Sequence, residues 1–355
     1  MVEQKACVNY LNRETVCQAC KDVCPTNAVH FENKLPVINQ SSCINCGACV
    51  SQCPSLAIDH IQKPYHYIKE QIDQFPNANI TCEKHEKYQK GIKVPCYLYL
   101  DLSLILNYGR NKETITFHTG KCKTCPMSEF ISVEEHLKNL QQELDHYQIP
   151  ITIQFIDTEL DDKNDQTVNG LTRRELFKQF SIKNVREAFF EKGEERETEP
   201  KRLTVRERVG LKRKVLNQYI QQKEMKNTKI QLPTKHFLAV EVSSTCSGCN
   251  VCESVCPTGA IQWQEQNGLS QLVFNIQECI GCAKCAICPE QSVQFSPVTL
   301  EEYKKRSSVI LKTFYVKQCV ECGESFRTNQ ETDTCSVCHA RKEKDPVRFF
   351  AHKLG

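Results

Sequence analysis

The feature that most constrains this chain is a cysteine-rich run that recurs in near copies. One copy, CINCGACVSQCP, begins at Cys43 and places four cysteines within eleven residues. The other copies are CQACKDVCP from Cys17, CSGCNVCESVCP from Cys246 and CIGCAKCAICP from Cys279. Proline follows the last cysteine of each run, where it fixes φ and needs no N–H partner. Thiols packed so densely along the chain indicate either disulfides or bound metal.

Composition and context favour metal. The chain has 24 cysteines in 355 residues, a length that suits two or three domains and does not need disulfides for stability. Its first residues, MVEQKACVNYLNRE, are charged and lack the apolar core of a signal peptide. No apolar run approaches the length of a membrane span. We therefore expect a protein of the reducing cytoplasm, where clustered cysteines bind metals.

The spacing C-x2-C-x2-C-x3-C-P favours iron–sulfur clusters over zinc. Zinc sites usually pair two separated CxxC knuckles, whereas three cysteines at successive x2 steps let one loop wrap a cubane. The x3 step predicts a helical turn that carries the fourth thiolate away. The run resembles that of bacterial two-cluster ferredoxins, in which three cysteines bind one [4Fe–4S] cluster and the fourth binds the neighbouring cluster.

The resemblance implies two ferredoxin-like modules, at residues 1–65 and 236–300, each with one pair of runs. The apolar stretches AVHF, LPVI, AIQW and LVFNI predict short strands beside the loops. The crossed ligand pattern of the family implies three sets of cysteines, each named here after one member. These are the Cys46 set (Cys24, Cys43, Cys46, Cys49), the Cys252 set (Cys246, Cys249, Cys252, Cys288) and the Cys282 set (Cys256, Cys279, Cys282, Cys285).

Two departures from the family pattern affect this assignment. Glu14 stands where the first run should have its leading cysteine, so that site has a three-iron cluster, a carboxylate ligand or a cysteine from elsewhere. We favour Cys7, an otherwise unexplained cysteine ten residues before Cys17. The Cys20 set is then Cys7, Cys17, Cys20 and Cys53. The last run ends with an x2 step, so Cys288 departs from the pattern as well.

Residues 76–158 predict a small α/β domain with a mostly parallel sheet. Strands and helices are expected to alternate, with strands at Ile80–Cys82, Ile92–Cys96, Thr114–Phe117 and Ile151–Ile156 and helices at Leu100–Tyr108 and Ile131–Tyr147. The segment has four cysteines, called the central cysteines here, at strand ends or in the loops that follow: Cys82, Cys96, Cys122 and Cys125.

The layout of residues 77–157 resembles the small iron–sulfur subunit of methyl-viologen-reducing hydrogenases. The shared features are a cysteine that ends a strand, a VPC further on, then a helix, a strand and a CxxC. This resemblance implies a [2Fe–2S] cluster on the central cysteines. Zinc on the same thiolates is an alternative, as are free thiols or a redox-active pair at Cys122 and Cys125.

Residues 159–235 form a basic segment without cysteine. From Arg173 to Lys235 there are eighteen Lys and Arg against nine Asp and Glu. Helices are predicted after a capping box at Thr172–Glu175 and over Val205–Lys226. The segment is interpreted as a solvated linker that holds the modules apart or as a docking surface for an acidic partner. Nucleic acid is not expected, because base-stacking aromatics are few and no DNA-binding motif is present.

The tail, residues 314–345, has the spacing of a zinc ribbon. Its two knuckles are separated by twelve residues and have four ligands, Cys319, Cys322, Cys335 and Cys338. Four thiolates form a closed shell around one zinc ion, with no open position for catalysis. The metal would stabilise a tail too short to bury a core. Iron in a rubredoxin-like site is the alternative.

The sequence has no G-x-G-x-x-G, Walker loop or nucleophile elbow, so no catalytic residue is assigned. We predict an α+β multidomain, polyferredoxin-like protein with four [4Fe–4S] clusters that passes electrons between redox partners. It is expected to be a subunit or carrier for a larger oxidoreductase, such as a formate dehydrogenase or hydrogenase. The alternatives are an accessory or assembly factor for such an enzyme and a thiol-based redox sensor.

Overall fold

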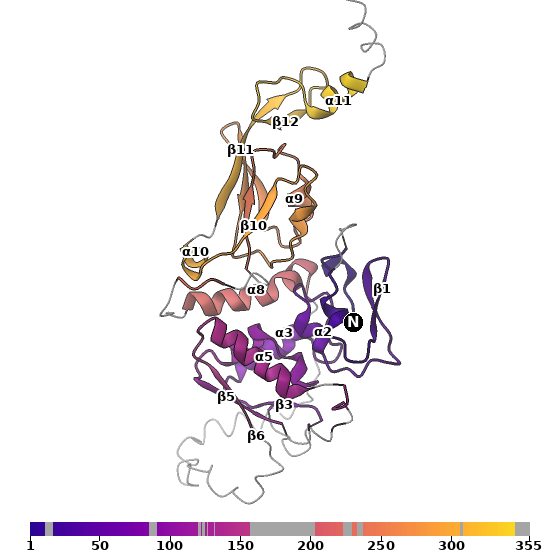
Figure 1. Ribbon diagram of the computed structural model, residues 1–355, viewed down its shortest axis with the longest axis vertical. Coiled ribbons are helices and arrows are strands. Elements are labelled where there is room, and N and C mark those ends of the chain that lie inside the picture. The colour runs from indigo at the N-terminus through magenta and orange to yellow at the C-terminus, as the bar shows by residue number, and fades with distance from the viewer. Residues whose placement is uncertain are drawn as a thin grey trace, which may run out of the picture.

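In the computed structural model the chain is elongated, with the tail at one end and the first module and central domain side by side at the other (Figure 1). The described residues are 1–10, 17–84, 91–119, 122, 125, 127–130, 132–156, 203–222, 229–232, 237–305 and 308–344. The capping box at Thr172–Glu175 and the helix predicted after it lie outside them. No helix within these ranges is long and apolar enough to cross a membrane.

The first module consists of two cysteine loops beside a hairpin. Strands β1 (Val29–Glu32) and β2 (Leu35–Ile38) lie where the apolar stretches predicted strands, and they pair antiparallel. Helices α1 (Ala19–Asp22) and α2 (Ala48–Gln52) are single turns that end just before Cys24 and Cys53. The helical turn predicted for the x3 step is therefore confirmed in both runs.

The central domain has parallel strand pairs, as predicted. Strand β3 (Ile80–Cys82) pairs with β4 (Ile92–Val94), and β5 (Thr114–His118) pairs with β6 (Thr152–Ile156). The described residues place these strands in two separate two-stranded sheets rather than one continuous sheet. The helices are α3 (Tyr65–Gln74), α4 (Leu102–Tyr108), α5 (Val133–His146) and the short 3₁₀ turn η2 (Tyr97–Tyr99).

Helix α4 is the buried centre of this domain. All seven of its residues are buried, as expected for an apolar run of this length. Asp101 caps the helix: its Oδ1 accepts the Leu104 N–H at 2.9 Å, and the Tyr65 hydroxyl donates to the same oxygen at 2.8 Å. The cap therefore joins α4 to the first turn of α3.

Helix α8 (Val205–Gln222) confirms the helix predicted here, but it is not a solvated spacer. It lies between the second module and the rest of the chain (Figure 1), and residues such as Arg208, Arg213 and Tyr219 are buried. Arg208 contacts the first module, and Lys212 forms an ion pair with Asp101 at 2.8 Å. The buried face of α8 therefore includes basic residues, which is unusual for an amphipathic helix.

The second module repeats the layout of the first with longer strands. Its elements are β7 (Ala239–Val242), α9 (Val251–Ser254), β8 (Ile261–Gln266), β9 (Leu269–Phe274), η4 (Lys284–Ile287), β10 (Val293–Ser296) and α10 (Leu300–Lys305). Strands β8 and β9, at the predicted apolar stretches, form an antiparallel hairpin, and β10 pairs antiparallel with β7.

The tail is continuous with the second module through one strand. Strand β11 (Val309–Gln318) pairs with β9 over its first part and with β12 (Ser325–Thr328) over its last part. The resulting sheet has the order β12-β11-β9-β8, and helix α11 (Ser336–Lys344) follows. The tail was given its own bounds at residues 314–345, but β11 begins at Val309 and is long enough to pair with strands of both the second module and the tail.

Candidate iron–sulfur and metal sites

The first module gathers its thiols into the two sets expected from the crossed pattern. In one, Cys46 interacts electrostatically with Cys24 and Cys43. In the other, Cys20 interacts with Cys53, Cys17 and Cys7. Cys7 thus lies with the cysteines that it was predicted to join, whereas Glu14 lies outside the described residues.

Burial holds these thiols in their neutral form when no metal is bound. It raises the pKa of Cys20 and of Cys49 to about 12, and the neighbouring thiols add to the effect. Metal ligation requires thiolates, so the binding of a cluster here must release protons. The same burial shields a bound cluster from water.

The loops between the ligands have a backbone that suits an anion. Asn45 (φ 53°) and Gly47 (φ 79°) flank Cys46 in left-handed conformations, and Gly281 (φ 70°) and Ala283 (φ 53°) flank Cys282 in the same way. Alternation of left-handed and right-handed residues turns successive N–H groups toward one side, which forms a concavity for negative charge. Since a thiolate-ligated cluster is an anion, the residues present fit [4Fe–4S] clusters.

Residues after Pro25 and Pro54 of the first module also support the thiolates. The Ala28 N–H donates to Cys24 Sγ at 3.2 Å, and the Ala57 N–H donates to Cys53 Sγ at the same distance. Both donors stand four residues after the cysteine, within equivalent Cys-Pro turns. Such hydrogen bonds favour the charged form of a ligand and influence the potential of a cluster.

The second module also brings its cysteines together in two sets, and Cys288, which departs from the family spacing, lies in one of them. Cys252 interacts with Cys249, Cys246 and Cys288. Cys285 interacts with Cys279, Cys282 and Cys256.

The shorter x2 step before Cys288 has a simple structural counterpart. In the other three runs an α-helical turn precedes the last cysteine, whereas here the 3₁₀ turn η4 does so, with the Cys288 N–H donating to the Cys285 carbonyl at 3.3 Å. A 3₁₀ turn has fewer residues per turn than an α-helix. It therefore accommodates the missing residue and still directs Cys288 toward Cys252.

Three of the central cysteines surround Tyr97, which interacts with Cys82, Cys122 and Cys96. The Cys96 thiol hydrogen-bonds to Cys82, which lowers the pKa of Cys82 to about 7 and raises that of Cys96. The Lys84 N–H also donates to Cys82 Sγ, at 3.3 Å. Cys125 is half-buried in the same loop as Cys122. The structure thus places Cys82 and Cys96 in contact, either as two ligands of one site or as a pair of interacting thiols.

The tail cysteines are packed more tightly than any of these sets. Their four Sγ atoms all lie within 4.8 Å of one another, and Cys322 and Cys335 are 3.9 Å apart. In the described part of the chain, they form the one group of three or more His, Cys, Asp or Glu residues that is so compact. Tetrahedral Zn–S bonds of about 2.3 Å require this close spacing.

The difference in spacing separates single-ion sites from cluster sites. Thiolates around several irons must stand further apart than thiolates around one ion. Within the described residues, the compactness expected of a single-ion site is found for the tail cysteines. In the tail, the Cys335 N–H donates to Cys319 Sγ at 3.3 Å and lowers the pKa of that thiol to about 6.

The five cysteine sites of the body follow one another through the molecule. Cys96 interacts with Cys46, which places the central cysteines beside the Cys46 set. Cys20 interacts with Cys49, which joins the two sets of the first module. The next step crosses between modules: one buried cluster contains Cys53 and Ile280, with Cys17 and Cys282 packed against it. The Cys252 set completes the series within the second module.

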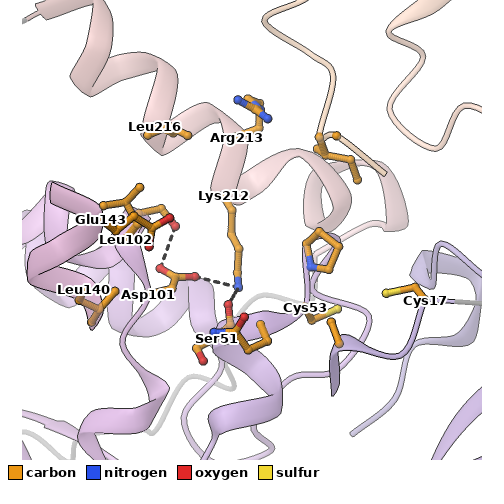
Figure 2. Close-up of a pocket in the computed structure, with 16 residues that line it drawn as sticks. Cys17, Ser51, Cys53, Asp101, Leu102, Leu140, Glu143, Lys212, Arg213 and Leu216 are labelled. Carbon is orange, nitrogen blue, oxygen red and sulfur yellow. Dashed lines mark hydrogen bonds and ion pairs between the residues drawn. The ribbon is translucent and has the colours of Figure 1, made fainter. Parts of the chain in front are cut away.

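Helix α8 holds this junction in place. Figure 2 shows Lys212 extending from the helix to Asp101 and to the end of α2. Its Nζ lies 2.8 Å from Asp101 Oδ2 and donates to the carbonyls of Val50 at 2.7 Å and Ser51 at 2.8 Å. Lys212, Asp101 and Ser51 line a cavity of about 230 Å³ that also reaches Cys17 and Cys53. Because they satisfy one another, this wall of the cavity is a structural anchor.

The same contacts bear on the predicted acidic partner. Arg208, Lys212 and Arg213 were part of the basic surface expected to dock it. All three turn inward, so they are not available to a partner on the surface. Sequence reasoning missed their role because a basic helix is normally solvated. It also missed Lys284 and Asn9, which lie at the junction between the modules and form no recognisable motif.

Comparison with known proteins agrees with the two modules. A family model described as a 4Fe-4S dicluster domain matches residues 245–292, and one described as a 4Fe-4S binding domain matches residues 36–59. Ferredoxin-1 of Chlorobaculum tepidum is 39% identical over 56 residues, which are 14% of this chain and 90% of that protein.

Two longer relatives share shorter stretches. The ferredoxin-type protein NapF of Haemophilus influenzae is 43% identical over 47 residues, which are 12% of this chain and 27% of that protein. The polyferredoxin-like subunit of an aliphatic sulfonate oxidoreductase from Pyrococcus furiosus is 49% identical over 37 residues, or 10% of this chain and 21% of that protein. The chain thus spans about a quarter of the length of these two relatives.

Proposed function

This chain belongs to the family of multi-cluster [4Fe–4S] ferredoxins, and on that premise we propose that it is a cytoplasmic electron-transfer protein with four [4Fe–4S] clusters. The clusters supply one-electron redox chemistry when bound. The observation that carries the proposal is the series of thiol sets, each beside the next, that extends from the Cys46 set to the Cys252 set.

The residues of the chain perform three tasks in this function. The cysteines of the four sets bind the clusters, with Cys7 as the ligand that replaces a cysteine at position 14. The left-handed loop residues, and in the first module the N–H groups of Ala28 and Ala57, stabilise the negative charge of the sites. Buried neighbours such as Val209 and Ile280 exclude water between the modules.

The remaining two sites are assigned different roles. A [2Fe–2S] cluster on Cys82, Cys96, Cys122 and Cys125 would extend the series by one site, because Cys96 neighbours Cys46. The compact tail cysteines suit one zinc ion with a structural role, because the shell is closed. The zinc ribbon then stabilises the end of the sheet that covers the second module.

The partners are proposed to be the electron donor and acceptor of a larger oxidoreductase, such as a formate dehydrogenase or a hydrogenase. The support is one relative, the polyferredoxin-like subunit of an aliphatic sulfonate oxidoreductase. No residue of this chain is assigned a catalytic role. An accessory or assembly factor for such an enzyme remains the second candidate, because cluster-binding proteins also deliver clusters.

A redox titration of the anaerobically loaded protein tests the proposal. Reversible reduction of its clusters, followed by reoxidation with a second redox protein and no loss of iron, is the expected result. Clusters that stay redox-silent, or that transfer to an apo-protein within minutes, would instead identify an assembly factor. Iron quantified before and after the cycle distinguishes the two outcomes.

A further inference from the structure

One charged side chain is buried between the thiol sets of the two modules. Lys284 lies in the second module between Cys282 and Cys285, and the residue is 4% exposed. Its ammonium interacts electrostatically with Cys282 of its own module and with Cys17 and Cys7 of the first module. The ammonium therefore lies between the Cys282 set and the Cys20 set.

A buried asparagine of the first module receives this ammonium. Lys284 Nζ donates to Asn9 Oδ1 at 3.3 Å, and the Cys17 N–H donates to the same oxygen at 2.7 Å. Asn9 Nδ2 donates in turn to the carbonyl of Cys17 at 3.0 Å and to that of Lys34 at 3.2 Å. The Asn9 side chain is thus held in one orientation by the backbone of Cys17. This network ties Lys284 to a predicted ligand of the opposite module.

Electrostatics explains why a cation belongs at this position. Two thiolate-ligated clusters are both anions, and they repel each other most when they face each other across a dry interface. Burial removes the water that would otherwise screen them, as the apolar cluster around Cys53, Ala57 and Ile280 shows. An ammonium between the two sets attracts both. It also favours the reduced state of each cluster, because reduction adds negative charge near it.

We propose that Lys284 is a positioning residue for electron transfer between the modules: its buried charge raises the reduction potentials of the two facing clusters and holds the modules in contact. The proposal rests on the electron-transfer function proposed above and extends it to a specific residue. The other two [4Fe–4S] sets, around Cys46 and Cys252, lie one site further from the charge in the series and are expected to be much less affected.

Comparison of variants with and without the charge is the test. Lys284→Gln removes the charge and keeps a polar side chain with N–H donors, and Lys284→Arg keeps the charge. Lys305→Gln is the matched control, because its side chain is 71% exposed on α10. EPR-monitored redox titration of each loaded protein then gives the midpoint potentials. We expect Lys284→Gln to lower two of the four potentials, each by about tenfold in the one-electron equilibrium, or about 59 mV.

The control and the arginine variant should retain the wild-type potentials. Unchanged potentials in Lys284→Gln, or an equal shift of all four, would overturn the proposal. If Lys284→Gln fails to load the clusters of the Cys20 and Cys282 sets while Lys284→Arg loads them normally, the two sites require the charge. Failure of both variants to load these clusters would overturn the proposal. A wild-type protein without reversible clusters would refute the proposed function itself, a result distinct from any of these.

Discussion

Arg208 Nη1 lies 2.9 Å from Asp59 Oδ2 in an ion pair whose side chains are 3% and 1% exposed. The pair joins α8 to the end of the first module, and Arg208 also donates to the Leu56 carbonyl at 3.2 Å. The other carboxylate oxygen of Asp59 accepts the Tyr65 N–H at 2.9 Å, which connects the pair to α3. One basic residue of α8 therefore holds three elements together.

Removal of this arginine should destabilise the protein strongly. Arg208→Met leaves the Asp59 carboxylate buried without its counter-charge, a change that costs about 3–5 kcal/mol in proteins. The measurement is anaerobic urea unfolding of the loaded protein. Lys305→Met, which breaks the exposed pair between Lys305 and Glu301, should lower the unfolding midpoint far less, because solvent screens that pair. Equal unfolding midpoints for the two variants would contradict the role given to Arg208.

Cys7 is expected to behave as a cluster ligand. Cys7→Ser should convert one cubane to a three-iron cluster or abolish it, because the Cys20 set would keep only three thiolates. Iron analysis and EPR spectra of the oxidised protein measure the change, and Cys17→Ser serves as a positive control within the same set. An unchanged iron content and spectrum for Cys7→Ser would leave Cys7 without a role in the site.

Gly248 lies where the tail packs closely against the loop that contains Cys246 and Cys249. Its φ is +76°, and a Cβ there would lie 3.1 Å from the Phe314 ring and 3.2 Å from Arg327 Cβ. Gly268 has a similar φ of +74° but nothing within 4 Å, so Gly268→Ala measures the backbone strain alone.

Gly248→Ala should therefore destabilise the protein by about 1–3 kcal/mol more than Gly268→Ala, the usual cost of overpacking. Thermal unfolding of both variants provides the comparison. The EPR signal of the Cys252 set should change only in Gly248→Ala, because Gly248 stands between two ligands of that set. Identical melting temperatures for the two variants would show that the tail does not press on this loop.

Loss of one tail cysteine should release about one zinc ion and loosen the C-terminal end of the sheet. Cys335→Ser opens the shell of the compact group, whereas Val337→Ser alters an exposed neighbour in the same knuckle as a control. Metal analysis should show zinc lost from the first variant only. The four cubanes should remain, with any spectral change confined to the Cys252 set. Loss of all four with the zinc would mean that the tail is required for the whole cluster fold.

Local sequence patterns predicted most of the cysteine sites and their strands. The spacing of each run favoured a cluster loop, because such a loop depends on adjacent residues, whereas the crossed sets were implied by the resemblance to two-cluster ferredoxins. Strand β3 was predicted with its observed bounds, and the 3₁₀ turn before Cys288 is the counterpart of the x2 step. These features need no information from distant parts of the chain.

The arrangement of the modules depends on contacts that a single sequence does not reveal. Arg208 and Asp59 are 149 residues apart, and Lys284 and Asn9 are 275 residues apart. All four are charged or polar residues, which local sequence patterns predict to be exposed to solvent. Burial of such groups occurs only where a distant partner compensates for lost hydration. For the same reason, the pairing of β11 with two different strands could not be read from its apolar pattern.

The central claim is that the chain holds four cubanes, and the content of iron and acid-labile sulfide tests it most directly. Protein prepared anaerobically, with its concentration determined by amino-acid analysis, should contain about sixteen irons per chain, or about eighteen with a [2Fe–2S] cluster on the central cysteines. Sulfide should match the iron in both cases. About eight irons per chain, with zinc occupying the remaining thiols, would contradict the claim and leave one ferredoxin module without its clusters.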